Sequence, residues 1–162
     1  RIAAGLVLDL SIAGGSQKMI GGQVEDVLGE RDGKMTPDKL EFIHHNKTAA
    51  LITAAVTMGI RLSDSYDVQK LEVAREIGKN IGLAFQVIDD ILDVTSDDAT
   101  MGKTTGLDAQ NEKMTYVSLY GIERSREIAA ELTGKAIADC QKLSDNCEFF
   151  KALITYMQNR IN

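Results

Sequence analysis

The sequence has almost no proline, tryptophan or cysteine, and few aromatic residues. Among 162 residues there are one Pro, no Trp and two Cys, and Phe, Trp and Tyr together make up 5%. Strands favour aromatic residues and proline interrupts helices, so these shortages favour helix over strand. With 44% hydrophobic and 26% charged residues, the composition is that of a globular domain or part of one. We expect an all-helical protein.

Positive charge is also scarce. The chain has 18 Lys and Arg against 24 Asp and Glu, a net charge of −6. A broad surface for nucleic acid or anionic lipid needs an excess of positive charge, so neither partner is expected. Phosphate binding would need a local basic cluster or a metal ion. No segment resembles a signal peptide, and no apolar run is long enough to span a bilayer.

The start of the sequence and its two cysteines each raise a smaller point. The chain starts within a helical pattern at Arg1, without an initiator Met, which predicts that it continues a longer chain. Cys140 and Cys147 lie seven residues apart in a segment that is expected to be helical. This spacing is weak evidence for a disulfide and fits a reducing cytoplasm, so we interpret both cysteines as filling core or surface positions.

Helical periodicity divides the chain into segments separated by polar turns. A helix is expected over residues 1–29, where Gly14-Gly15 and Gly21-Gly22 mark either breaks or close approaches of another backbone or a ligand. Residues 30–34 predict a turn, and Thr36-Pro37 predicts a helix start. The remaining expectations are a helix from Pro37 to Gly59, a cap at residues 63–65, a helix to Val94, a polar loop over 96–111, and helices over 114–121, 122–145 and 147–161.

The most informative segment is residues 85–93, Phe-Gln-Val-Ile-Asp-Asp-Ile-Leu-Asp. Helical spacing gathers Asp89, Asp90 and Asp93 on one side of the last turns of a helix, where the macrodipole already disfavours negative charge. No Lys or Arg lies between Lys79 and Lys103. Either something outside this helix neutralises the cluster, or the carboxylates take up protons as a coupled group.

A hard divalent cation is the natural candidate, because Mg²⁺ binds one or two carboxylates and completes its shell with water and phosphate oxygens. For an arbitrary acidic triplet, a solvated helix end would be the better interpretation. Here the apolar neighbours argue against a simply wet face: Phe85, Val87, Ile88, Ile91 and Leu92.

The segment Gly82–Asp93 resembles the second aspartate-rich motif of the (E)-isoprenyl diphosphate synthases, the farnesyl and geranylgeranyl diphosphate synthase type. Three further elements resemble family motifs in the family's order, and with them the resemblance extends over nearly the whole chain. They are Gly21-Gly22-Gln23 with Asp26, Lys47-Thr48-Ala49-Ala50-Leu51, and Gly102-Lys103 followed by Asp108 and Lys113. The resemblance implies the C-terminal half of a single all-α domain of the isoprenoid synthase type, spanning residues 1–162.

The same resemblance implies a role for each matching residue. Asp89, Asp90 and Asp93 would bind Mg²⁺ that bridges to an allylic diphosphate. Lys47 would contact that diphosphate, and Thr48 and Gln86 would turn oxygen dipoles toward the carbocation. The remaining roles are phosphate binding by Lys103 and Lys113, support of that network by Asp108, and lining of the site by Gln23 and Asp26.

Without the resemblance, several of these residues would have simpler explanations. Lys47 alone would more often be a surface lysine, and Lys103 and Lys113 would be solvated loop charges. The adjacent His44 and His45 point to different helix faces, so we expect both to be structural. Gly78 and Gly82 are expected to permit close helix packing rather than to bind phosphate, because they do not start a helix.

The implied reaction is the Mg²⁺-dependent condensation of isopentenyl diphosphate with an allylic diphosphate, in a cytoplasmic homodimer. The chain has no first aspartate-rich motif and no upstream basic motif, so it is expected to be inactive alone. Two alternatives stay open: a non-catalytic subunit of a prenyl synthase, and a terpene cyclase. A cyclase usually has a second metal motif rich in Asn, Ser and Glu, which differs from Asp89-Asp90-Ile91-Leu92-Asp93.

Overall fold

The computed structural model describes residues 2–64, 66–100, 114–143 and 147–161, with side chains omitted for 96–100. Every regular element in these ranges is helical and none is a strand, which confirms the all-α prediction. The elements are α1 (Ile2–Gly14), α2 (Met19–Asp32), α3 (Pro37–Ile43), a π-helical turn η1 (His44–Ala49), α4 (Ala50–Leu62), α5 (Val68–Thr100), α6 (Tyr116–Tyr120), α7 (Ile122–Leu143), α8 (Glu148–Gln158) and a 3₁₀ turn η2 (Asn159–Ile161).

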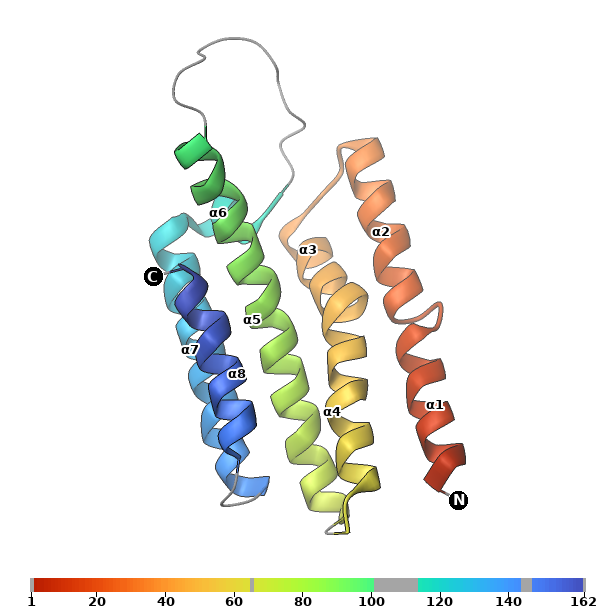
Figure 1. Cartoon of the computed structure of the whole chain (residues 1–162). Coiled ribbons are helices and arrows are strands. Elements are labelled where there is room, and N and C mark those ends of the chain that lie inside the picture. The colour runs from red at the N-terminus through yellow and green to blue at the C-terminus, as the bar shows by residue number, and fades with distance from the viewer. Residues whose placement is uncertain (1, 65, 101–113, 144–146, 162) are drawn as a thin grey trace.

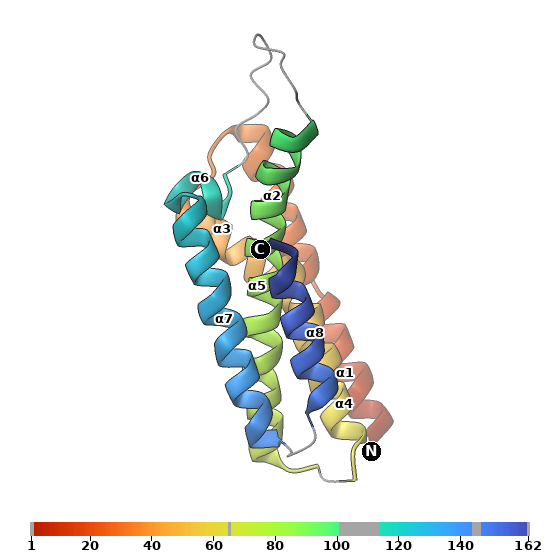
Figure 2. The same cartoon turned by 60° about the vertical axis from the view of Figure 1, so that its left-hand side comes forward.

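The long helices lie side by side with roughly parallel axes. Helix α5 is central, with α7 and α8 on one side and α4 on the other (Figures 1 and 2). Helices α1 and α2 follow each other as an outer column beyond α4. The main core lies where α5 meets α7 and α8, and its fully buried side chains include Ile77, Val87, Ile88, Ile91, Ala129, Ala136, Cys140 and Ile154. No helix in the described ranges is long and apolar enough to cross a membrane.

Local signals explain where several helices begin. Thr36 caps α3, since its Oγ accepts a hydrogen bond from the Lys39 amide at 3.3 Å, and Pro37 occupies the first helical position as predicted. The cap expected at residues 63–65 is wrong, with Ser65 outside the described residues. Instead, Asp67 Oδ1 accepts the Lys70 amide at 2.7 Å and α5 begins at Val68. Asp67 lies directly before the first helical residue and provides the better cap.

The break in the first predicted helix lies at Gly15–Lys18 and not at Gly21-Gly22. Gly21 belongs to α2 but packs against the residues of this break. A Cβ there would lie 2.2 Å from the Ser16 carbonyl oxygen, so the close contact needs glycine. Helix α2 then runs on to Asp32 and ends at Gly33, whose φ of 61° is left-handed. The turn therefore starts about three residues later than residues 30–34 predict.

The second half of the chain agrees more closely with expectation. Helix α5 continues through Thr100, so the polar segment predicted from Ser96 begins as helix. Residues 101–113, which hold the rest of that predicted loop, lie outside the described residues. The three C-terminal helices are confirmed as α6, α7 and α8 with η2.

Two glycines of α5 bring its backbone against the η1–α4 segment, as predicted. A Cβ at Gly82 would lie 2.4 Å from Ala49 Cα, and one at Gly78 would lie 2.5 Å from Thr53 Cα. Both positions face backbone atoms, which cannot move aside as a flexible side chain can. The contact between α5 and the η1–α4 segment therefore depends on glycine at both places.

Gly82→Ala should destabilise the protein, because the added methyl group overlaps the Ala49 backbone. Overpacking of this kind costs about 1–3 kcal/mol. Gly134→Ala is the matched control: Gly134 lies inside α7 with nothing within 4 Å of an added Cβ, so the change should stabilise by about 0.4–1 kcal/mol. Urea unfolding of both variants measures the difference. Equal stabilities would show that the α5–η1 contact can relax.

The two cysteines are free and buried in the core. The Cys147 thiol donates to the Cys140 carbonyl oxygen at 2.9 Å. Burial raises the pKa of the Cys140 thiol to about 11, with the nearby Cys147 as a smaller cause.

A raised thiol pKa means that the folded state favours the protonated form. The stability that this provides is complete below the unfolded pKa of 9.0 and is lost as pH rises through about 11. We expect native Cys140 to resist iodoacetamide at pH 8 and to react once the protein is unfolded in urea. Mass spectrometry of the tryptic peptides tests this. Rapid native labelling at pH 8 would contradict the burial.

Candidate active site

The part of α5 that carries Asp89, Asp90 and Asp93 has one buried face and one polar face. We call this part the acidic end of α5. Val87, Ile88 and Ile91 are completely buried against the core. Asp89 and Asp90 are half-buried, and Asp93 is exposed. The helix therefore fixes its carboxylates by packing its apolar face, which agrees with the expectation that this segment is not simply a solvated helix end.

The donor atoms present suit a hard cation. Asp89 and Asp93 are four residues apart on one face of a helix, and carboxylate oxygens are the ligands that Mg²⁺ prefers. Within the described residues, no three His, Cys, Asp or Glu side chains are already gathered as a metal-binding group. The Mg²⁺ site therefore stays a prediction.

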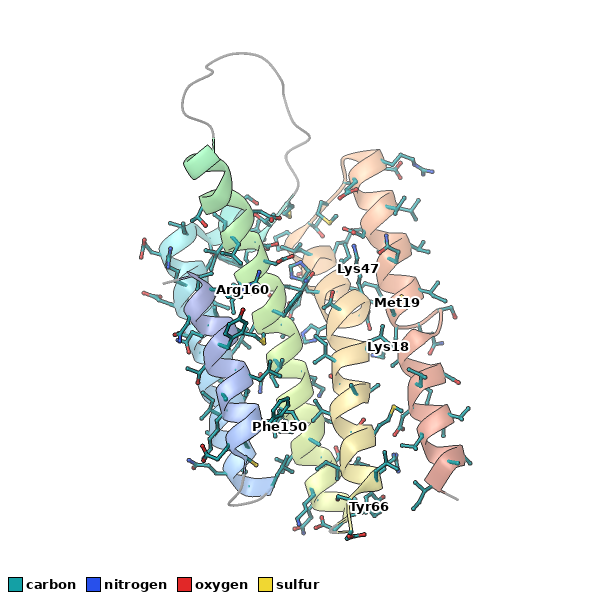
Figure 3. The ribbon with its side chains drawn as sticks, in the orientation of Figure 1. Lys18, Met19, Lys47, Tyr66, Phe150 and Arg160 are labelled. Carbon is teal, nitrogen blue, oxygen red and sulfur yellow. The ribbon has the colours of Figure 1, made fainter. Side chains whose placement is uncertain are left out.

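Lys47 lies on η1 and is held by α2. Its Nζ donates a hydrogen bond of 2.5 Å to Oδ2 of Asp26, which is only 6% exposed. The two backbones also meet directly, because a Cβ at Gly22 would lie 2.4 Å from the Lys47 nitrogen. Figure 3 shows Lys47 on the side of its helix that faces α2. Gly22, which was predicted to mark a break or a close approach, therefore lies against the backbone of Lys47.

The other predicted site residues are placed less uniformly. Thr48 and Gln86 are half-buried, and Gln23 is exposed on α2. The turn of α5 that leads into Gln86 packs on η1, since Gly82 contacts Ala49. Elements α2 and η1 therefore bring Asp26 and Lys47 together, and α5 packs on η1 one turn before Gln86. Three predicted residues lie outside the described part of the chain: Lys103, Asp108 and Lys113.

The π-helical geometry of His44–Ala49 is a feature that the sequence did not reveal. Such turns insert one extra residue into a helix and occur frequently at functional sites. This turn carries both Lys47 and Thr48. It begins at His44, which is 5% exposed and stacks on the Tyr116 ring with centroids 5.4 Å apart and planes at 20°. His44 is therefore part of the packing, as we expected.

A hydrogen bond of Asp90 was also not foreseen. Its Oδ2 accepts the backbone N–H of Tyr116, the first residue of α6, at 2.8 Å. These residues are 26 positions apart. No local signal in the sequence indicates this contact.

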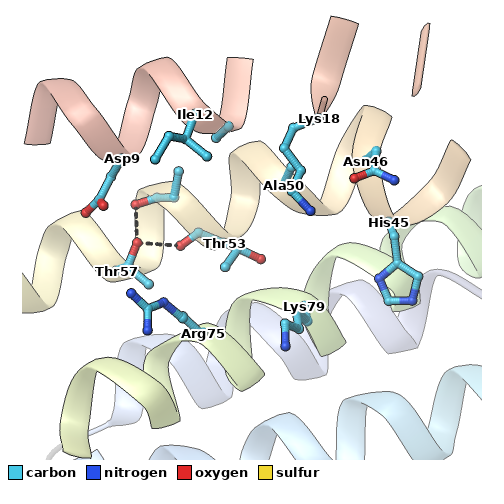
Figure 4. A pocket seen from close by; sticks show the side chains of 12 residues that line it. Asp9, Ile12, Lys18, His45, Asn46, Ala50, Thr53, Thr57, Arg75 and Lys79 are labelled. Carbon is cyan, nitrogen blue, oxygen red and sulfur yellow. Dashed lines mark hydrogen bonds between the residues drawn. The ribbon is translucent and has the colours of Figure 1, made fainter. Parts of the chain in front are cut away.

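A cavity of about 500 Å³ lies between α1, the η1–α4 segment and α5 (Figure 4). None of the predicted site residues lines it. Its wall is mixed: Ile12, Ala13, Ala50 and Ala54 supply apolar surface, and the polar or charged residues are Asp9, Lys18, His45, Asn46, Thr53, Thr57, Arg75 and Lys79.

Comparisons with known proteins show which family this chain resembles. The polyprenyl synthetase family model matches residues 11–153. The farnesyl diphosphate synthase of Micrococcus luteus is 41% identical over 98% of this chain, which covers 54% of that protein. Geranylgeranyl pyrophosphate synthase 3 of Arabidopsis thaliana, a chloroplastic protein, is 42% identical over 80% of this chain and 36% of its own length.

Solved structures show the same fold. A geranyltransferase of Helicobacter pylori, complexed with magnesium and isoprenyl diphosphate, has a TM-score of 0.74 and 35% identity, covering 98% of this chain and 51% of its own. A geranyltransferase of Legionella pneumophila has a TM-score of 0.80 at 25% identity over 99% of this chain and 51% of its own. The chain spans about half, or less, of the length of the curated relatives named above.

Lys47→Met should destabilise the protein, because it leaves the buried Asp26 carboxylate without its cation. With Lys47 partly exposed, we expect a loss of about 1–3 kcal/mol, and much of it should be recovered in the double variant Asp26→Asn/Lys47→Met. The control Lys79→Met breaks an exposed pair with Glu76 at 2.6 Å and should cost less than about 1 kcal/mol. Urea unfolding measures these three variants, the single variant Asp26→Asn and the wild type. Strictly additive effects would argue against a coupled Asp26–Lys47 pair.

Proposed function

The chain belongs to the polyprenyl synthetase family, and on that basis we propose that residues 1–162 form the C-terminal part of a single prenyl diphosphate synthase domain. Helix α1 supports this proposal. Apart from Asp9 and Ser11 its residues are apolar or glycine on every side, yet Ile2, Val7, Leu8, Leu10 and Ile12 are each more than half exposed. A helix of this kind normally lies inside a larger core, so further protein is expected to cover it.

The proposed reaction joins isopentenyl diphosphate head to tail to an allylic diphosphate, giving a short prenyl diphosphate such as farnesyl or geranylgeranyl diphosphate. The observation that carries it is that α5, the helix that bears Asp89 and Asp93, packs directly on the turn that bears Lys47. Diphosphate needs cations, and the 18 Lys and Arg of this chain are outnumbered by 24 Asp and Glu. A metal ion would supply additional positive charge. We further propose a homodimer in the cytoplasm, which the two free thiols suit.

The acidic residues would hold the metal. Asp89 and Asp93 share one face of α5, and we propose them as direct ligands, while Asp90 accepts the Tyr116 N–H. Bound Mg²⁺ would supply positive charge that stabilises the departing diphosphate.

The remaining residues would bind the substrate and guide the charge that develops. Lys47 would bind the same diphosphate from η1, oriented by Asp26. Thr48 and Gln86 are half-buried, so their oxygens would act in a partly dry environment on the allylic cation. Isopentenyl diphosphate would attack that cation through its double bond, and the new carbocation would give a proton to the released diphosphate to form the product alkene. Lys103 and Lys113 would bind phosphate, Asp108 would support them, and Gln23 would line the entrance.

The full-length protein that contains this chain should incorporate radiolabelled isopentenyl diphosphate into an acid-labile product in the presence of Mg²⁺. Primers from dimethylallyl to farnesyl diphosphate should each be tried. A hydrocarbon product formed without isopentenyl diphosphate would identify a terpene cyclase instead. Activity that appears only after a second prenyl synthase subunit is added would identify a non-catalytic partner.

Asp89→Ala in that protein should slow turnover by about 10³-fold or more while the fold persists. Removing one of several crowded negative charges even favours stability by some tenths of a kcal/mol. The control Glu76→Ala removes an exposed carboxylate from the same helix and should leave turnover within about twofold. Turnover and thermal midpoint are measured together. Unchanged turnover in Asp89→Ala would refute the metal role.

A further inference from the structure

Asp90 differs from its two acidic neighbours in what it contacts. Successive residues on an α-helix are rotated by about 100°, so Asp90 does not share the direction of Asp89. Its Oδ2 accepts the Tyr116 N–H at 2.8 Å. The first amides of a helix have no partner within that helix, and a carboxylate is a strong acceptor for them. The bond therefore ties α5 to the start of α6.

The Tyr116 side chain extends this link to a third element. Its ring stacks on His44, the first residue of η1, with centroids 5.4 Å apart. Burial is the main cause that raises the pKa of Tyr116, with smaller contributions from Glu41, Tyr120 and Asp90. The phenol is therefore neutral near pH 7, and its ring acts as packing. Figure 2 shows α6 beside α3, at the end of the molecule where η1 begins.

The turn that receives this contact depends on its surroundings. A π-helical turn is less stable than regular α-helix and persists where neighbouring packing holds it. Gly22 and Asp26 contact it at Lys47, and Gly82 contacts it at Ala49. The Tyr116 ring contacts its first residue. Loss of that third contact would let the start of the turn shift, and Lys47 and Thr48 with it.

We propose that Asp90 is a positioning residue: by accepting the Tyr116 N–H it holds the Tyr116 ring against His44, and so orients the π-helical turn that carries Lys47 and Thr48 relative to the acidic end of α5. The consequence for catalysis rests on the proposed function. The physical linkage from Asp90 to His44 does not.

The test uses the full-length protein and compares Asp90→Ala with Asp90→Asn. The alanine variant loses the acceptor and should lower kcat/KM for the allylic diphosphate about tenfold, mainly through a higher KM. The asparagine variant keeps an oxygen acceptor and should recover most of that loss, with the Mg²⁺ concentration for half-maximal rate little changed. Tyr116→Ala should resemble Asp90→Ala, and the double variant should be no slower than either single one.

The second readout is NMR of ¹³C-labelled histidine, with the His44 signal assigned through His44→Gln. Aromatic stacking shifts ring signals, so Asp90→Ala should move the His44 signal toward its position in Tyr116→Ala, while Asp89→Ala should not. Thr115→Ala is the matched control. It removes the Thr115–Ser118 capping box of α6 and leaves the Asp90 bond in place, so the His44 signal should stay and activity should remain within about twofold.

Two results would overturn the proposal. One is an asparagine variant as slow as the alanine variant with a raised Mg²⁺ requirement, which would make Asp90 a direct metal ligand. The other is a His44 signal that Asp90→Ala does not move. If the wild-type protein has no prenyl transferase activity, the proposed function fails, and the NMR comparison still decides whether Asp90 positions His44.

Discussion

Backbones approach one another at η1 without side chains between them, and the rest of the structure depends on that contact. Gly22 of α2 lies against the Lys47 backbone, and Gly82 of α5 lies against Ala49. A methyl group added at either glycine would overlap the facing backbone and prevent the contact. Because helices packed at this distance cannot slide independently, the groups of α2, η1 and α5 are set relative to one another by backbone geometry. Side-chain flexibility then has little influence on where Lys47 lies.

Local features of the fold were predictable because their causes lie within a few residues. Thr36-Pro37 started a helix where predicted, and the spacing of Gly78 and Gly82 indicated close packing that the structure confirms. The apolar residues around Asp89 indicated a buried helix face, and Val87 and Ile88 are buried. Boundaries were less predictable. Several polar residues precede α5 and could have capped it. Asp67 does so because it directly precedes the first turn.

The features that were missed link distant parts of the chain. The Asp26–Lys47 bond joins residues 21 apart, and the Asp90–Tyr116 bond joins residues 26 apart. The π-helical turn at His44–Ala49 is contacted by α2 at Gly22, by α5 at Gly82 and by the Tyr116 ring. Periodicity and capping describe one element at a time and contain no information on such pairs. The family resemblance supplied residue roles but not these contacts.

The Asp26–Lys47 pair bears on the proposed binding of a diphosphate by an acidic chain. A solvated lysine would lose much rotamer freedom when it binds an anion. Here the buried Asp26 carboxylate already holds the Lys47 ammonium at 2.5 Å, so part of that entropy is lost during folding and not during binding. The pair also cancels much of the positive charge of Lys47. In the proposed mechanism, attraction for a diphosphate would then come largely from cations outside this pair, and a metal ion bound by the carboxylates of α5 would supply them.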